Sequence, residues 1–204
     1  MIKLENVEKT IKRKKVLKNI DLSISQNDYI LLKGHNGCGK TMLLRMIAGL
    51  ITPSSGEIIN DEEYTYGVII ENPTFLSGES AFYNLKYLAD LNHIITEEAI
   101  LAWMMKLNLY EVRNKKVRSF SLGMKQRLAI IQAIMEEPDV LLLDEPFNAI
   151  DDDHLDIIYD LLNQYSREGH TIIIASHGYY SEHCDFNRII TMSDGSIKND
   201  VRIR

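Results

Sequence analysis

A glycine-rich stretch near the start of the chain has the residue types and the spacing of a phosphate-binding loop. Residues 34–41 read Gly-His-Asn-Gly-Cys-Gly-Lys-Thr, which fits the pattern G-x-x-x-x-G-K-[ST]. Glycines let the backbone curl so that several N–H groups point at phosphate oxygens, and the helix that follows adds its positive N-terminal end. We expect Lys40 to reach the β- and γ-phosphates of a nucleotide and the Thr41 hydroxyl to ligate Mg²⁺. The residues expected to contact the nucleotide from this stretch are Gly34, Asn36, Gly37, Cys38, Gly39, Lys40, Thr41 and Met42.

Two adjacent carboxylates further along the chain complement this loop. The apolar run 140–143 ends in Asp144, and Glu145 follows directly. An aspartate at the end of a buried strand is placed to hold Mg²⁺ through water, and Glu145 is placed to polarise a water in line with the γ-phosphate. Each pattern alone also fits a simpler alternative, namely a glycine turn without ligand and a solvated acidic turn. Their combination favours nucleotide hydrolysis.

The strands and helices that would position these residues follow from the pattern of apolar residues. Runs of consecutive apolar residues, typical of strands in a parallel sheet that is covered on both faces, occur at 29–32, 68–70, 140–143 and 171–175. A half-buried strand is indicated by the alternation over 20–24. Helices are expected over 42–48, ending at Gly49, and over 152–168.

The middle of the chain has a different character, because helical spacing replaces β-branched runs from about residue 79 to residue 137. We therefore predict a helical subdomain, over approximately 76–125, inserted into a single domain that spans 1–204. Residues 12–15, a run of four basic side chains, indicate an exposed hairpin turn, with contact to nucleic acid as the alternative. A second hairpin turn is expected at 193–196.

Length and composition narrow the class of protein. The 204 residues are 45% apolar and 25% charged, which excludes a disordered chain, and the net charge of −6 argues against a partner that is a nucleic acid. No run approaches the roughly 18 apolar residues of a membrane-spanning helix, and the first residues lack the apolar core of a signal peptide. We therefore expect a cytosolic location and two free thiols, at Cys38 and Cys184.

Three further motifs make the chain resemble the nucleotide-binding domain of ABC transporters over nearly its whole length. Residues 120–127 read Phe-Ser-Leu-Gly-Met-Lys-Gln-Arg and are similar to the ABC signature, 148–151 look like the D-loop, and His177 looks like the switch histidine. The resemblance implies an α/β fold, a RecA-like P-loop NTPase core with a mostly parallel sheet. It also implies an N-terminal antiparallel β subdomain and the inserted α-helical subdomain.

The signature also has a physical interpretation. Ser121 is a good N-cap, and the apolar face of the helix that follows it predicts a buried helix whose N-terminus is a second anion site. If the family geometry holds, two chains pack head to tail with ATP between them. Lys40 and Thr41 of one subunit and Ser121 and Gly123 of the other then meet the γ-phosphate. The resemblance adds Asp151 to the nucleotide-contacting residues and His177 to the catalytic ones, with Lys40 and Glu145. An ordinary capped helix is the alternative for the signature.

The sequence departs from the family pattern at several positions. Leu122 replaces one glycine of the signature, and Met124 replaces its glutamine. Glu71 occupies the Q-loop position, where most relatives carry glutamine, and adds negative charge beside Mg²⁺, so we count it with Thr41 and Asp144 as a metal-site residue. The position of the adenine-stacking aromatic is assigned to Ile11, which predicts apolar contact only.

The resemblance implies an ATPase subunit that drives export through a separate transmembrane permease, with a second nucleotide-binding domain, expected to be another copy of this chain, as its ATP-dependent partner. The subunit would lie on the cytoplasmic inner face of the cell membrane. Residues 71–74 and 121–127 resemble the branch that exports bacitracin- or lantibiotic-type peptides. The alternatives are a soluble ABC ATPase without a transport role and a weakly hydrolysing regulatory subunit. A GTPase is disfavoured, since 114–117 read Asn-Lys-Lys-Val and lack the aspartate of a guanine-reading motif.

Overall fold

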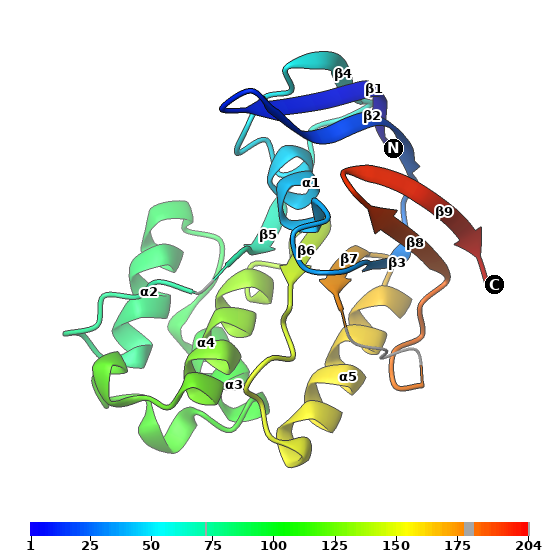
Figure 1. Cartoon of the computed structure of the whole chain (residues 1–204). Coiled ribbons are helices and arrows are strands. Elements are labelled where there is room, and N and C mark those ends of the chain that lie inside the picture. Colours follow the sequence, from blue (N-terminus) through cyan, green and yellow to red (C-terminus); the bar gives the residue numbers. More distant parts are fainter. Residues whose placement is uncertain (72, 178–181, 204) are drawn as a thin grey trace.

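The computed structural model describes residues 1–71, 73–177 and 182–203 (Figure 1). Asn72, which belongs to the 71–74 motif, lies outside these residues. The strands are β1 (Ile2–Ile11), β2 (Lys14–Ile24), β3 (Tyr29–Lys33), β4 (Ser55–Asn60), β5 (Tyr66–Ile69), β6 (Val140–Asp144), β7 (Thr171–Ser176), β8 (Arg188–Ser193) and β9 (Ser196–Arg202). The helices are α1 (Lys40–Ile47), α2 (Ala81–Asn92), α3 (Glu97–Lys106), α4 (Leu122–Ile134) and α5 (Asp152–Arg167), with short 3₁₀ helices at Tyr110–Val112 and Val117–Ser119.

The larger sheet has six strands in the order β5-β6-β7-β3-β8-β9. All neighbouring strands in it are parallel except β8 and β9, which form an antiparallel hairpin. The three apolar runs at 29–32, 140–143 and 171–175 are its central strands, as predicted. The run at 68–70 was placed slightly wrong, because the strand is Tyr66–Ile69 and only Gly67 and Ile69 in it are buried. β5 is an edge strand that pairs with β6 alone. It is therefore less buried than the central strands, which have a neighbouring strand on both sides.

Successive side chains of the central strands enter two different cores. In β3, Tyr29 and Leu31 face the core that α2 to α5 cover, and Ile30 and Leu32 face the core formed with α1 and the N-terminal sheet. Figure 1 shows the resulting layers, with α4 and α5 on one side of the sheet and α1 beneath the N-terminal strands on the other. A strand that is covered on both faces needs apolar residues at every position, which explains the unbroken apolar runs.

The smaller sheet is antiparallel, in the order β2-β1-β4. The basic cluster contributes its turn, as predicted, because Lys12 and Arg13 join β1 to β2 with φ angles of 46° and 67°. The second predicted hairpin is also present, with Asp194 and Gly195 at positive φ between β8 and β9. Two central residues at positive φ match the twist of paired antiparallel strands.

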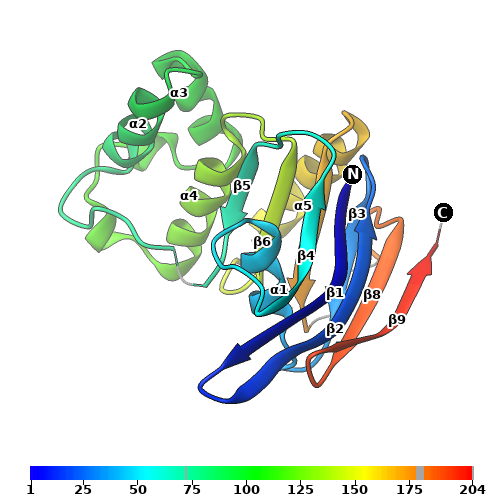
Figure 2. The ribbon, with the colours of Figure 1, turned by 90° about the horizontal axis from the view of Figure 1, so that it is seen from above.

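The predicted helical stretch contains α2, α3 and α4, which gather on the side of the molecule away from the N-terminal sheet in Figure 2. Ser80 and Thr96 cap α2 and α3, each accepting a hydrogen bond from a backbone N–H of the first turn. α4 links this group to the sheet, because its buried face packs on β5 and β6 within one core. The predicted end of the helical subdomain, at about residue 125, therefore falls inside α4. The limits of this subdomain stay a prediction.

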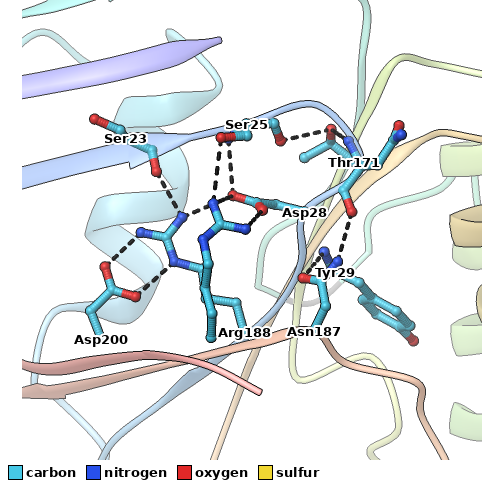
Figure 3. Close-up of polar contacts among 10 residues, drawn as sticks. Ser23, Ser25, Asp28, Tyr29, Thr171, Asn187, Arg188 and Asp200 are labelled. Carbon is cyan, nitrogen blue, oxygen red and sulfur yellow. Dashed lines mark hydrogen bonds and ion pairs between the residues drawn. The ribbon is translucent and has the colours of Figure 1, made fainter. Parts of the chain in front are cut away.

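A buried cluster of charges joins the last two strands to the start of β3 (Figure 3). The Asp28 carboxylate is 1% exposed and accepts hydrogen bonds from Arg188 at 2.8 Å and Arg202 at 2.9 Å. Arg188 also donates to both oxygens of Asp200 and to the Ser23 carbonyl oxygen. The hydrogen bond to Asp200 is the main cause that raises the pKa of Arg188, against the opposing effect of burial. The cluster joins β8 and β9 to β2 of the smaller sheet and to Asp28, which precedes β3.

The cluster predicts a strong dependence of stability on Asp28. Asp28→Asn removes the charge that two arginines share and leaves the buried Arg188 undercompensated, so we expect the free energy of unfolding to fall by about 3 kcal/mol. Urea denaturation followed by circular dichroism measures the change. Arg167→Gln is the matched control, because Arg167 pairs with Asp185 at the exposed surface and its loss costs less than about 1 kcal/mol. Equal effects of the two substitutions would contradict this account of the cluster.

Candidate functional site

The predicted phosphate loop lies between β3 and α1, at the carboxyl end of the parallel sheet. Gly39 is the N-cap of α1 with φ 114°, a left-handed conformation that an L side chain rarely adopts. Lys40 begins the helix, is only 6% exposed, and donates from Nζ to the Gly34 carbonyl oxygen at 2.7 Å. The lysine ammonium is thereby held over the loop. Strand, loop and helix follow in the order that the motif requires.

Thr41, at the start of α1, is in direct contact with Asp144, at the end of β6. The Thr41 hydroxyl donates to Oδ2 of Asp144 at 2.5 Å. Burial is the main cause that raises the pKa of Asp144. The charges of Glu145 and Glu71 raise the pKa further, whereas the hydrogen bond from Thr41 and the positive charge of Lys40 oppose the rise. A hydroxyl and a carboxylate side by side form an oxygen donor set of the kind that Mg²⁺ prefers.

The backbone turns away from the direction of β6 at Glu145, directly after Asp144. Its φ angle is 49°, and its backbone N–H donates to the carbonyl oxygen of Ala175 at 2.8 Å. Its Oε1 accepts from the backbone N–H of His177 at 3.0 Å and lies 2.8 Å from ring Nδ1 of the same residue. Its Oε2 accepts from the Ser176 hydroxyl at 3.0 Å. Glu145 and His177 were both predicted as catalytic residues, and the structure brings them into contact.

Two hollows adjoin these residues. The first, which we name the loop hollow, has a volume of about 360 Å³. It is lined by Val16, Asn36, Gly37, Gly39, Lys40, Thr41, Met42, Arg45, Glu71, Asp144 and Glu145. The second, the carboxylate hollow, has a volume of about 430 Å³ and is lined by Glu71, Gln126, Asp144, Glu145 and Asn148. Most of the predicted nucleotide and metal residues therefore face one shared space.

Six of the predicted nucleotide contacts do not line the loop hollow, namely Gly34, Cys38, Ile11, Ser121, Gly123 and Asp151. Ile11 lies at the end of β1 beside the hairpin turn, whereas Val16 of β2 lines the hollow. Cys38 is 1% exposed, and its N–H donates to the His35 carbonyl oxygen at 3.2 Å. The burial alternation along β2 does not identify Val16, because Leu17 is the buried residue at this point of the strand. The roles of Ile11 and Cys38 toward a nucleotide stay predictions.

Glu71 has an ion-pair partner within the chain. Its φ angle is 66°, and its carboxylate lies 2.7 Å from the guanidinium of Arg45 in α1. Glu71 therefore lines both hollows with part of its charge already balanced. Arg45 was not predicted as a site residue. The sequence does not predict this ion pair, because its two residues lie in separate elements, α1 and the end of β5.

The signature residues occupy the start of α4. Ser121 is the N-cap, and its hydroxyl accepts from the Met124 N–H at 3.2 Å, as predicted. Gly123 leaves no space for a side chain, because an added Cβ would lie 2.5 Å from the Ala149 carbonyl oxygen. Asp151 caps α5 and accepts from the His154 N–H, and its contact with the His154 side chain lowers its pKa. Ser121, Gly123 and Asp151 line neither hollow.

The chain therefore has the features of a P-loop nucleotide-binding protein: a strand, a glycine loop and a helix in succession, a buried lysine in the helix, and a contact from the next residue, Thr41, to Asp144 at the end of β6. The family described as ABC transporter matches residues 17–148, and the chain belongs to this family. Within it the chain is an ATP-binding and ATP-hydrolysing subunit.

Named relatives and solved structures agree with this assignment. YybJ of Bacillus subtilis, an uncharacterized ABC transporter ATP-binding protein, is 44% identical over 87% of this chain and 85% of its own length. SrtF of Streptococcus pyogenes, a lantibiotic transport ATP-binding protein, is 33% identical over 87% of this chain and 80% of its own length. The dimeric structure of MJ0796, a bacterial ABC transporter cassette, superposes with a TM-score of 0.90 at 26% identity, covering 100% of this chain and 99% of that chain.

The described residues contain neither a membrane-spanning helix nor a metal-enclosing cluster of side chains. No helix among residues 1–71, 73–177 and 182–203 has both the length and the apolar character needed to cross a bilayer. In the same ranges no group of three or more histidine, cysteine or acidic residues could enclose a metal ion. Mg²⁺ does not need such a group, since it binds through one or two carboxylates together with substrate phosphates and water. Thr41 and Asp144 fit that requirement.

Both cysteines are free, as predicted, and both are buried. Burial also raises the pKa of the Cys184 thiol to about 11, so little thiolate exists near neutral pH. We expect Ellman's reagent at pH 8 to modify neither thiol within minutes in the native chain. Both thiols should react promptly in 8 M urea, which is the positive control. Rapid reaction of either thiol in the native chain would contradict the burial of that cysteine.

Proposed function

We propose that two copies of this chain bind ATP in a head-to-tail dimer and hydrolyse it, with Glu145 as general base. The observation that carries the proposal is the position of Glu145, which lines the loop hollow beside the Thr41–Asp144 contact and is anchored to His177. A carboxylate at this place can accept the proton of a water that attacks the γ-phosphate. Lys40 would bind the β- and γ-phosphates, because its ammonium already lies over the loop.

We assign the metal site to Thr41 and Asp144, with Glu71 at its border. A bound Mg²⁺ supplies neutralisation of the phosphate charge. Thr41 offers a hydroxyl and Asp144 a half-buried carboxylate, and both line the loop hollow. Because Glu71 is paired with Arg45, its carboxylate is held beside this site without adding its full charge to it.

The position of the signature supports the proposed dimer. Ser121 and Gly123 stand at the N-terminus of α4 and do not line the hollow that contains Lys40. A helix N-terminus stabilises anions, so the signature of one copy can complete the phosphate site of the other. We include Asp151, at the N-terminus of α5, among the residues that face the partner nucleotide. The dimeric cassette structure that superposes on this chain supports such an arrangement.

We further propose that the dimer drives export of bacitracin- or lantibiotic-type peptides through a separate permease, at the inner face of the cell membrane. The similarity to SrtF supports the substrate class. α2 offers a surface for the permease, since three side chains spaced four residues apart, Tyr83, Tyr87 and Leu91, are exposed on one face of the helix, and Ile94 continues them. The segment from Glu71 to α2 would carry the motion from the hydrolysis site to this surface.

The role of Glu145 predicts a specific behaviour of Glu145→Gln. The amide keeps the size of the side chain but cannot accept a proton, so hydrolysis should fall by about a hundredfold or more while ATP still binds. Phosphate release and size-exclusion chromatography in ATP and Mg²⁺ measure the rate and the accumulated dimer. Glu111→Gln, which removes an exposed carboxylate outside both hollows, is the control and should hydrolyse normally. Normal turnover by Glu145→Gln would refute the assignment of the base.

The surface on α2 yields a separate test. Tyr87→Glu and Leu91→Glu place charges on the exposed apolar face and should reduce co-sedimentation of the chain with native membranes several-fold. The ATPase rate of the isolated chain should stay unchanged, because neither residue lines a hollow. Ile59→Glu, on the exposed part of β4, is the matched control. Equal membrane association of all three variants and the natural chain would exclude this face as the docking surface.

A further inference from the structure

The two oxygens of the Glu145 carboxylate have different donors. Oε1 is shared by the backbone N–H and the ring of His177, while Oε2 accepts from the Ser176 hydroxyl at 3.0 Å. A hydrogen bond from a neutral donor to a charged acceptor is stronger than one between neutral groups. The contact with Ser176 therefore adds a directional constraint that the contacts of His177 on the other oxygen do not provide.

Ser176 is itself held in place. It is the last residue of β7, stands in register with Lys33 of β3, and is 0% exposed. The side chain of His177, by contrast, is 54% exposed. A hydrogen bond that is shielded from water is worth more than an exposed one, because solvent does not compete for the donor. Of the side-chain donors to Glu145, the hydroxyl is therefore the one shielded from solvent.

Glu145 needs such a constraint. The last side-chain torsion of a glutamate is broad and roughly two-fold, so the carboxylate plane is poorly defined unless contacts fix it. Asp144 is the adjacent residue, and its carboxylate is already engaged by Thr41. A Glu145 carboxylate that turned freely would lose its alignment with the attacking water and would approach a like charge.

We propose that Ser176 is a positioning residue for ATP hydrolysis, whose hydroxyl holds Oε2 of Glu145 so that the carboxylate faces the attacking water. Ser176 does not contact ATP in this role and acts only through Glu145. The inference rests on the proposed function of Glu145 as the base. It goes beyond that proposal by assigning the orientation of the base to a buried hydroxyl on the neighbouring strand.

The matched pair Ser176→Thr and Ser176→Val tests the inference, because the two variants have nearly the same shape and differ in the hydroxyl. We expect Ser176→Val to lower kcat for ATP by about tenfold to a hundredfold, with KM within about twofold of the natural chain. Ser176→Thr should retain most of kcat. Circular dichroism melting curves verify folding, and Ser176→Ala gives the same kcat-against-KM split if the larger side chains do not fit.

A second measurement separates positioning from a structural role. In the Glu145→Gln background, Ser176→Val should cause no further loss of kcat, since a residue that acts through another has no effect once the other is gone. Equal kcat values for the folded Thr and Val variants, or a further loss in the Glu145→Gln background, would overturn the inference. Normal turnover by Glu145→Gln alone would instead refute the proposed function, so the two failures are distinguishable.

Discussion

Two carboxylates that follow one another along the chain must be held apart, and the architecture of the site depends on this constraint. Asp144 ends β6 and is engaged by Thr41, whereas Glu145 turns away at φ 49° and is engaged by the end of β7. A left-handed conformation costs a non-glycine residue about 1–2 kcal/mol. The hydrogen bond that the Glu145 N–H donates to Ala175, and those that its carboxylate accepts from Ser176 and His177, offset that cost. Adjacent acids in sequence thereby acquire separate partners and separate roles.

The order of strands in the parallel sheet supplies these partners. β7 lies between β6 and β3, so the strand ends that carry the acids, the anchors of Glu145 and the phosphate loop stand next to one another. Along the chain the same three strands are far apart, and α1 to α5 occupy the intervals between them. Crossover connections of this kind bring the carboxyl ends of parallel strands to one edge, where ligands of open α/β sheets bind.

Local patterns in the sequence predicted much of this site. The glycine spacing located the loop, the apolar runs located the central strands, and the N-cap role of Ser121 followed from its place before an apolar helical face. These features depend on neighbouring residues only. The positive φ angles of Glu71 and Glu145 could not be predicted in this way, because tertiary contacts impose them.

Contacts between distant parts of the chain were the features that sequence patterns could not provide. The Arg45–Glu71 ion pair, the Ser176–Glu145 hydrogen bond and the position of Val16 in the loop hollow all depend on how separate elements pack. The apolar run at 68–70 likewise misplaced β5, which spans Tyr66–Ile69 at the edge of the sheet. A single sequence shows the propensities of its segments, whereas these contacts are determined by how the segments pack against one another.

The buried charge cluster has a consequence for the order in which the sheet assembles. Asp28 lies 160 and 174 positions away from the arginines that neutralise it, Arg188 and Arg202. Until those arginines dock, the carboxylate beside β3 lacks its counter-charges and favours hydration over burial. The strand that leads into the phosphate loop therefore reaches its final packing only when β8 and β9 have joined the sheet, which makes formation of the loop hollow depend on contacts of long sequence separation.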